Sequence, residues 1–223
     1  MRFLHGTMSN AKLNSAVHTL AVVGASGSGK STLAQSLASR CQVSKALPDA
    51  TLLTLDNYYK DLSHLSFAER DRLNFDHPSA LDMDLFTDHV RMLSRGQLIE
   101  QPIYDFTVHS RTDRTELISP APLLVIEGIL LAAHEPLLAL IDTLVFVDTP
   151  LELCLQRRID RDVEQRNRSA ASVREFWFDR AVPMFKTFGD PARSAADVVV
   201  DGRDDLNKMM TSLLDHLRPD LLV

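Results

Sequence analysis

The stretch Gly24-Ala25-Ser26-Gly27-Ser28-Gly29-Lys30-Ser31 matches the pattern GxxxxGK[ST]. It follows a short apolar run at 20–23, which predicts a buried strand, and it precedes a segment at 31–39 with helical spacing of Leu and Ala. Glycines let the backbone curl so that successive N–H groups face phosphate oxygens, and the start of a helix adds partial positive charge. The stretch therefore predicts a loop that binds a nucleoside triphosphate.

Within this loop two side chains have separate expected tasks. Lys30 is expected to reach the β- and γ-phosphates, and the hydroxyl of Ser31 to ligate Mg²⁺. Glycine is scarce elsewhere, because the chain has only 8 in 223 residues, about half the usual ~7% usage, and three of them lie in this loop. The predicted nucleotide-binding residues are Gly24, Ala25, Ser26, Gly27, Ser28, Gly29, Lys30, Ser31 and Thr32.

Composition narrows the class of protein around the loop. With 45% apolar and 24% charged residues the chain can bury a core, and a net charge of −6 argues against a broadly electrostatic nucleic-acid binder. The two cysteines, Cys41 and Cys154, cannot make a disulfide framework. The longest apolar region, 121–147, is broken by charged residues, Gly and Pro, and residues 1–17 lack a signal-peptide core. We expect a cytoplasmic protein with no membrane span and no nucleic-acid partner.

The other apolar runs alternate with helical patterns. This alternation predicts an α/β fold, a P-loop NTPase-type parallel sheet with helices on both faces. We expect a flexible leader at 1–17 and a single domain at 18–223, with a β-hairpin insertion at about 98–119. Thr149 is expected to cap a helix with Pro150 in its first position and Glu152 completing a capping box. The expected strands are 51–55, 123–126, 143–147 and 196–200, and the expected helices 81–94, about 151–163, about 171–185 and 204–217.

A small protein with this loop is typically a GTPase switch, a transport ATPase domain or a kinase for a small acceptor. No glycine has Asp three residues before it, so the DxxG motif of GTPases is missing, and Asn207-Lys208-Met209-Met210 lacks the Asp of NKxD. The Leu-Ser-Gly-Gly signature of transport ATPases does not follow the loop. These absences favour a kinase.

Acidic residues at the ends of two expected strands support the same class. Ligands of open α/β sheets bind outside the carboxyl ends of the strands, where Asp56 and Glu127 fall. Phosphoryl transfer needs one carboxylate near the acceptor hydroxyl and another near Mg²⁺. We assign Asp56 as the base, and the predicted metal ligands are Ser31, Glu127 and Asp56.

Five arginines crowd twelve residues at the end of the helix expected from 151: Arg157, Arg158, Arg161, Arg166 and Arg168. A lid of arginines at about 157–170 would neutralise charge that develops during phosphoryl transfer and exclude water. The alternative is a solvated helix face whose arginines pair with the neighbouring Asp160, Asp162 and Glu164. The catalytic residues we predict are Asp56, Lys30, Arg161 and Arg166.

Further segments follow the loop in a recognisable order. They are Asp56-Asn57-Tyr58-Tyr59-Lys60-Asp61, Asn74-Phe75-Asp76-His77-Pro78-Ser79-Ala80, Pro102-Ile103-Tyr104-Asp105-Phe106, His109-Ser110-Arg111, Glu127-Gly128-Ile129-Leu130, Phe146-Val147-Asp148-Thr149 and Arg157-Arg158-Ile159-Asp160-Arg161-Asp162. Together they resemble the uridine kinase (uridine–cytidine kinase) family from about residue 18 to residue 200.

The resemblance implies phosphorylation of the 5′-hydroxyl of uridine and cytidine by ATP or GTP with Mg²⁺, a reaction of pyrimidine salvage. By position, Asp76 would hold the ribose hydroxyls, Tyr104 and His109 would read the base, and Phe106 would pack beside them. Arg158 and Arg161 match arginines on the substrate and phosphate sides, and Arg166 and Arg168 match the lid, Arg168 on the nucleotide. The acceptor-binding residues implied are Asp76, Tyr104, Phe106, His109 and Arg158.

Three positions depart from the family pattern. Phe176 stands where the family usually has a nucleoside-contacting Gln, Arg166-Asn167-Arg168 replaces Arg-Gly-Arg, and Asp201-Gly202-Arg203 replaces Pro-Arg-Gly. Two alternatives therefore stay open: a related P-loop kinase for another hydroxyl acceptor, and a nucleotide-binding regulator without turnover. Family members are often homotetramers, so the resemblance also implies a homo-oligomer.

Overall fold

A computed structural model describes residues 17–44, 46–70, 72–166 and 168–221, so sixteen of the seventeen residues of the expected leader lie outside it. Its main sheet has five strands in the order β2-β5-β1-β6-β7, and every neighbouring pair is parallel. The expected α/β fold with a parallel sheet is confirmed. The strands are β1 (His18–Val23), β2 (Ala50–Thr54), β5 (Leu123–Glu127), β6 (Thr143–Asp148) and β7 (Val198–Asp201).

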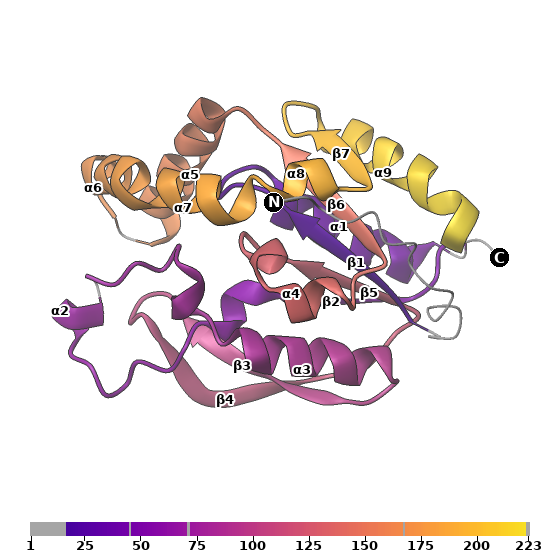
Figure 1. The fold of residues 1–223 in the computed structure, drawn as a ribbon, viewed down its shortest axis with the longest axis horizontal. Coiled ribbons are helices and arrows are strands. Elements are labelled where there is room, and N and C mark those ends of the chain that lie inside the picture. Colours follow the sequence, from indigo (N-terminus) through magenta and orange to yellow (C-terminus); the bar gives the residue numbers. More distant parts are fainter. Residues whose placement is uncertain (1–16, 45, 71, 167, 222–223) are drawn as a thin grey trace, which may run out of the picture.

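Both faces of this sheet are covered, and the alternation of side chains along each strand divides the core in two. Along β1, Ala21 and Val23 join one buried cluster, whereas Leu20 and Val22 join the other. The second cluster lies under α1 (Lys30–Val43) and α9 (Leu206–Leu221), and the first lies under α3 (Met83–Ser94) and α4 (Glu135–Leu138). Figure 1 shows α3 and α9 on opposite sides of the sheet.

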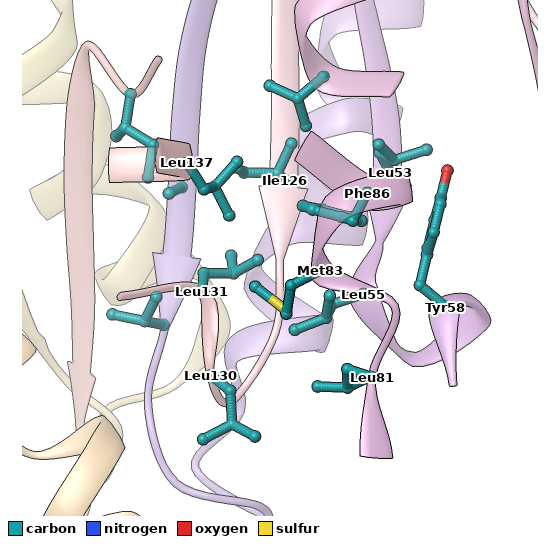
Figure 2. Close-up of a cluster of buried hydrophobic side chains, with 14 of the residues drawn as sticks. Leu53, Leu55, Tyr58, Leu81, Met83, Phe86, Ile126, Leu130, Leu131 and Leu137 are labelled. Carbon is teal, nitrogen blue, oxygen red and sulfur yellow. The ribbon is translucent and has the colours of Figure 1, made fainter. Parts of the chain in front are cut away.

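The first cluster also fixes the segment that carries Asp56. Figure 2 shows side chains of η1 (Leu55–Tyr58), of α3 and of the turn after β5 gathered together. Leu55, Phe86 and Leu131 are fully buried there, and the Tyr58 ring packs edge-on against Phe86 at a centroid distance of 4.8 Å. Asp56 therefore lies in a 3₁₀ turn anchored on both sides by core residues, two residues beyond the end of β2.

The expected hairpin is present as a separate antiparallel pair, β3 (Ile99–Asp105) with β4 (Ser110–Ile118). It lies along α3, away from the main sheet (Figure 1). Its register shifts between Pro102 and Tyr104, because Pro102 has no N–H to donate to the ladder. At its tip His109 has φ 52°, an uncommon conformation for a residue other than glycine.

The start of α5 (Leu151–Gln165) differs from the prediction. Thr149 does not cap the helix, because its hydroxyl instead donates to the carbonyl oxygen of Ser28 at 2.9 Å. Pro150 occupies the cap position rather than the first helical position, and no capping box forms with Glu152. The local capping pattern at Thr149 is therefore overridden by a tertiary hydrogen bond. This bond connects the residues before α5 to the phosphate-binding loop.

The helix expected at 171–185 is longer and irregular. It runs as α6 (Ala170–Phe176), the π-helical segment η4 (Trp177–Ala181), α7 (Val182–Met184) and a second π-helical segment η5 (Phe185–Gly189). Such π-helical segments occur frequently at functional sites. The remaining elements are α2 (Phe67–Arg70), η2 (Pro78–Ala80), η3 (Leu131–Ala133) and α8 (Ala192–Ala195). Within the described ranges no helix has the length and apolarity needed to cross a bilayer.

Candidate active site

The carboxyl ends of the three neighbouring strands β1, β5 and β2 bring the predicted reactive groups together. The strand register sets Glu127 opposite Val22 on one side and Thr54 on the other. The loop after β1 contains the glycine pattern, and the turn after β2 contains Asp56. Sheet topology thus places the loop, Glu127 and Asp56 at one edge, as expected for an α/β protein of this kind.

The glycine-rich loop has the conformation that only its glycines permit. Gly27 has φ +84°, and a Cβ there would lie 2.3 Å from the carbonyl oxygen of Cys154 in α5. Two side chains hold the loop from outside: the carbonyl oxygen of Ser28 accepts from the Thr149 hydroxyl and, at 3.3 Å, from Nη1 of Arg157. Lys30, at the first position of α1, is buried. The loop is therefore preformed, with the positive end of α1 behind it.

The predicted metal ligands lie at the bottom of this loop. The Ser31 hydroxyl donates to Oε2 of Glu127 at 3.0 Å, and Glu127 is 4% exposed. Burial raises the pKa of the Glu127 carboxyl; Lys30 acts to lower it, and the negative charge of Asp56 raises it again. Two neighbouring carboxylates and a hydroxyl with this excess of negative charge fit Mg²⁺, which is commonly held by one or two carboxylates together with substrate phosphates.

Beside the loop lies a cavity that collects the predicted acceptor residues from three separate segments: the residues before η2, the β3–β4 hairpin and α5. Asp56 and Lys30 lie at one part of its wall, and Phe176 at another. The cavity is lined by Ser26, Lys30, Ser31, Asp56, Tyr59, Phe75, Asp76, Tyr104, Phe106, His109, Ile129, Arg158, Arg161, Arg166, Arg168 and Phe176. All five predicted acceptor-binding residues are among them, and their individual roles stay predictions.

Aromatic rings form one wall of this cavity. Tyr104 packs between Tyr59 and Phe106, with a centroid distance of 5.0 Å to each. The His109 ring stacks on Phe75 at 5.2 Å and 21° between planes. Burial raises the pKa of Tyr104, so its hydroxyl stays protonated, and this buried hydroxyl has no hydrogen-bond partner among the described residues. The wall therefore offers flat apolar surface and one free donor, which suits a planar ligand with polar edges.

A buried carboxylate lies apart from this wall. Oδ2 of Asp76 accepts from Nη1 and Nη2 of Arg158 at 3.5 and 3.4 Å, and Asp76 is 7% exposed. The guanidinium of Arg158 also lies 5.3 Å from the centre of the Phe176 ring and 5.8 Å from Trp177. Arg158 thus holds Asp76 in place, and both residues line the cavity.

The arginines of the expected lid do not form a solvated face. Arg158 is 7% exposed at its side chain, Arg166 27% and Arg161 32%, and all three pair with Asp162, whose side chain is fully buried. The neighbouring Asp160 is exposed and accepts from Gln156 instead. Burial and Arg161 lower the pKa of Arg166, and Asp162 and Asp56 oppose that shift. Positive charge is therefore concentrated at the cavity rather than in solvent.

A second, more open groove adjoins the first on the other side of the loop. Lys30, Ser31, Asp56, Arg161 and Arg166 line both cavities, so they lie where the two meet. The groove is lined by Gly27, Gly29, Lys30, Ser31, Thr32, Gln35, Thr54, Asp56, Asn57, Phe106, Glu127, Arg157, Arg161, Arg166, Gly202, Asp204, Leu206 and Met209. One cavity on each side of a shared reactive edge is the arrangement that transfer between two ligands requires.

Some predicted residues lie elsewhere than expected. Arg168, predicted to bind the donor nucleotide, lines the acceptor cavity and lies 5.3 Å from the Phe176 ring. Gly24, Ala25 and Ser28 line neither cavity and shape the loop from within. Sequence reasoning missed Tyr59, Phe75 and Met209, whereas Arg157 was expected only as part of the lid and lines the donor groove. Tyr59 and Phe75 lie inside the quoted family segments, whereas nothing local to Met209 marks it.

Comparisons with known proteins also indicate a kinase. Residues 19–207 match the model of the phosphoribulokinase / uridine kinase family. A uridine kinase from Vibrio cholerae serotype O1 is 42% identical over 80% of this chain and 84% of that protein, and one from Haemophilus influenzae is 38% identical over 87% and 91%. A solved structure of a putative fructose transport system kinase from Silicibacter sp. TM1040 covers 84% of this chain and 91% of its own, with a TM-score of 0.67 at 20% identity. These similarities favour a kinase over the regulator without turnover.

Proposed function

The chain belongs to the phosphoribulokinase / uridine kinase family, and on that premise we propose that it phosphorylates the 5′-hydroxyl of uridine and cytidine with ATP or GTP. The observation that carries the proposal is the acceptor cavity, in which Asp56, Asp76, Tyr104 and His109 converge beside the lysine of the phosphate-binding loop. Its aromatic wall suits a pyrimidine ring, and its buried carboxylate suits a pair of ribose hydroxyls.

Each residue then has a physical task in the transfer. Asp56 accepts the proton of the 5′-hydroxyl as that oxygen bonds to the γ-phosphorus, while the bond from that phosphorus to the bridging oxygen breaks and the nucleoside diphosphate leaves. Lys30, Arg161 and Arg166 line the junction of the two cavities and neutralise negative charge that develops on the transferred group. Asp76 accepts hydrogen bonds from the ribose hydroxyls, and Tyr104 donates to the edge of the base. Binding in the two adjoining cavities would bring the attacking 5′-oxygen close to the γ-phosphorus, and this proximity would supply much of the acceleration.

Ser31, Glu127 and Asp56 would hold the Mg²⁺ that we propose. When bound, the ion would supply positive charge that offsets the negative charge of the donor phosphates. We place the reaction in pyrimidine salvage in the cytoplasm, in keeping with two free, buried cysteines, and we expect a homo-oligomer.

The test is release of ADP from Mg-ATP across a panel of uridine, cytidine, thymidine, adenosine, ribose and fructose. We expect acceleration by uridine and cytidine only, with the product identified as the 5′-monophosphate by mass spectrometry. Acceleration by a sugar but not by either pyrimidine nucleoside would overturn the proposed acceptor. Release that is independent of any acceptor would overturn the proposed transferase.

The same assay tests the proposal that Asp56 is the base. Asp56→Asn removes the proton acceptor but keeps the shape, so kcat should fall by a factor of about 10²–10⁴ while ATP binding, measured by calorimetry without Mg²⁺ because Asp56 is also a proposed metal ligand, stays as in the wild type. Asp88→Asn is the control, because Asp88 lies exposed on α3 and pairs with Arg91. A kcat within threefold of wild type for Asp56→Asn would remove Asp56 as the base.

A further inference from the structure

Asp162 combines complete burial with a position directly behind the cationic side of the acceptor cavity. Its relative exposure is 0%, and it lines neither the acceptor cavity nor the donor groove. It lies in the last turn of α5, before the expected lid continues through Arg166 and Arg168. Charged side chains are almost never fully buried unless they are paired, so its partners define its role.

Those partners are three arginines that do line the cavity. Oδ1 of Asp162 accepts from Nε of Arg161 at 2.8 Å and lies 3.7 Å from Nε of Arg166. Nε of Arg158 lies 3.6 Å from Oδ2, a distance that makes an ion pair rather than a hydrogen bond. One carboxylate is therefore shared by the guanidiniums at positions 158, 161 and 166.

The main chain of the same residue ties down the segment that follows. The carbonyl oxygen of Asp162 accepts from the backbone N–H of Arg166 and from that of Arg168, both at 3.2 Å. The first bond caps the end of the helix, and the second fixes the main chain at Arg168. The side chain of Asp162 thus holds Arg158 and Arg161. Arg166 is held both by the side chain of Asp162 and by its main-chain carbonyl.

Stabilisation of the fold does not by itself explain a fully buried carboxylate such as that of Asp162. The desolvation of a buried carboxylate offsets much of its attraction to the arginines, so buried ion networks contribute little net stability. Three guanidiniums around one pocket also repel one another, and without a shared anion they would spread toward solvent. A carboxylate behind them keeps them together and leaves their outer N–H groups directed at the cavity.

We infer that Asp162 is a positioning residue for phosphoryl transfer: it holds Arg161 and Arg166 at the junction of the two cavities and, through Arg158, holds the carboxylate of Asp76. This inference rests on the proposed function, because it concerns the arginines that would neutralise the transferred phosphoryl group. Asp162 itself touches neither substrate.

The first experiment uses Asp162→Asn, which keeps the shape and removes the charge, with Asp160→Asn as the matched control on the exposed side of α5. We expect kcat for uridine phosphorylation to fall on the order of 100-fold in Asp162→Asn, since small displacements of groups at the reacting centre cost this much. Uridine KM should rise through Arg158 and Asp76, whereas Asp160→Asn should match wild type in both. A kcat within threefold of wild type in folded Asp162→Asn would overturn the inference.

A double-mutant cycle separates positioning from a general structural role. In an Arg161→Met background, Asp162→Asn should reduce kcat about tenfold less than it does in the wild type, because part of its effect acts through that arginine. Fully additive effects on kcat would mean that Asp162 does not act through Arg161.

A measurement on the wild-type protein remains decisive if Asp162→Asn does not fold or if no nucleoside is phosphorylated. With ¹⁵N-arginine labelling, the Nε–H proton of Arg161 should exchange with water at least about tenfold more slowly than that of the exposed Arg114. The Arg161→Met variant assigns the signal. Equal exchange rates would overturn the inference, whereas slow exchange in a protein without nucleoside kinase activity would reject only the proposed function.

Discussion

The two cavities that meet at Lys30 are built in opposite ways. The phosphate-binding part of the donor groove is one continuous stretch, the loop from Gly24 to Ser31, whose shape follows from its own glycines and from the helix that begins at Lys30, although most of the groove's other lining residues come from distant segments. The acceptor cavity takes its lining from segments as distant as Tyr59, Phe106 and Phe176, which share no local pattern. The first is a local structure that the fold supports, and the second exists only because the fold assembles it.

The phosphate-binding loop and the acceptor cavity also differ in the contacts that hold them in place. Contacts to its main chain support the loop: Thr149 and Arg157 donate to the carbonyl oxygen of Ser28, and Gly27 approaches the main chain of α5 too closely for a side chain. Side chains support the acceptor cavity, through ring packing around Tyr59 and through the pair between Arg158 and Asp76. Substitutions in the loop should therefore act through the backbone, whereas those in the acceptor cavity should act through single polar contacts.

The largest effect should come from Gly27→Ala, which breaks the donor side alone. A Cβ there would meet the Cys154 carbonyl oxygen at 2.3 Å, so the loop must shift, and we expect the donor KM to rise about a hundredfold, equivalent to about 2.7 kcal/mol. Gly96→Ala is the matched control: Gly96 also has positive φ, at +75°, but a Cβ there meets nothing within 4 Å. The control should lose about 1–2 kcal/mol of stability and keep its donor KM. Equal donor KM values in both variants would contradict the close-approach argument.

A smaller effect should follow Asp76→Asn, which breaks the acceptor side alone. Loss of charged hydrogen bonds worth about 1.5–3 kcal/mol should raise the uridine KM about 10–100-fold, with the donor KM unchanged. Steady-state kinetics with each substrate varied in turn measures both constants. A donor KM that rises in parallel would mean that Asp76 belongs to both sides and would erase the distinction.

The smallest effect should come from Glu127→Gln, a change at the donor groove that alters the pH dependence of stability. Its raised pKa means that the folded protein binds this proton more tightly than the unfolded chain, so the unfolding free energy falls as pH rises above 4.5, the ordinary value for the carboxyl. Glu127→Gln removes this titration. In the absence of ligands, the melting temperature of Glu127→Gln relative to that of wild type should therefore increase as the pH rises from 4.5 to 7.

Differential scanning calorimetry measures this gain, which should be a few degrees, since 1 kcal/mol moves the melting temperature of a domain of this size by about 2–4 °C. Glu116→Gln is the control, because Glu116 is exposed on β4. A difference between Glu127→Gln and wild type that shrinks as the pH rises would show that Glu127 is better stabilised in its charged form than its burial implies.

Several features of the fold and of the site were predictable because they depend on neighbours in sequence. The glycine pattern, the apolar strands and the hairpin around Pro102 all follow from local spacing and residue type. The expected cap at Thr149 was wrong for the converse reason: its hydroxyl bonds to the carbonyl of Ser28, 121 positions away, and no local pattern reports such a partner. The same limit applies to Met209, which reaches the donor groove from α9.

By itself, the sequence determined that this chain binds a phosphate group through a glycine-rich loop, and that acids follow two of its strands, because each of these properties is encoded within a few adjacent residues. Only the tertiary structure decided that Asp162 is buried behind three arginines while Asp160, two positions earlier, faces solvent. The physical reason is that burial and charge pairing depend on which elements pack against a helix face, and that packing is set by contacts between distant parts of the chain.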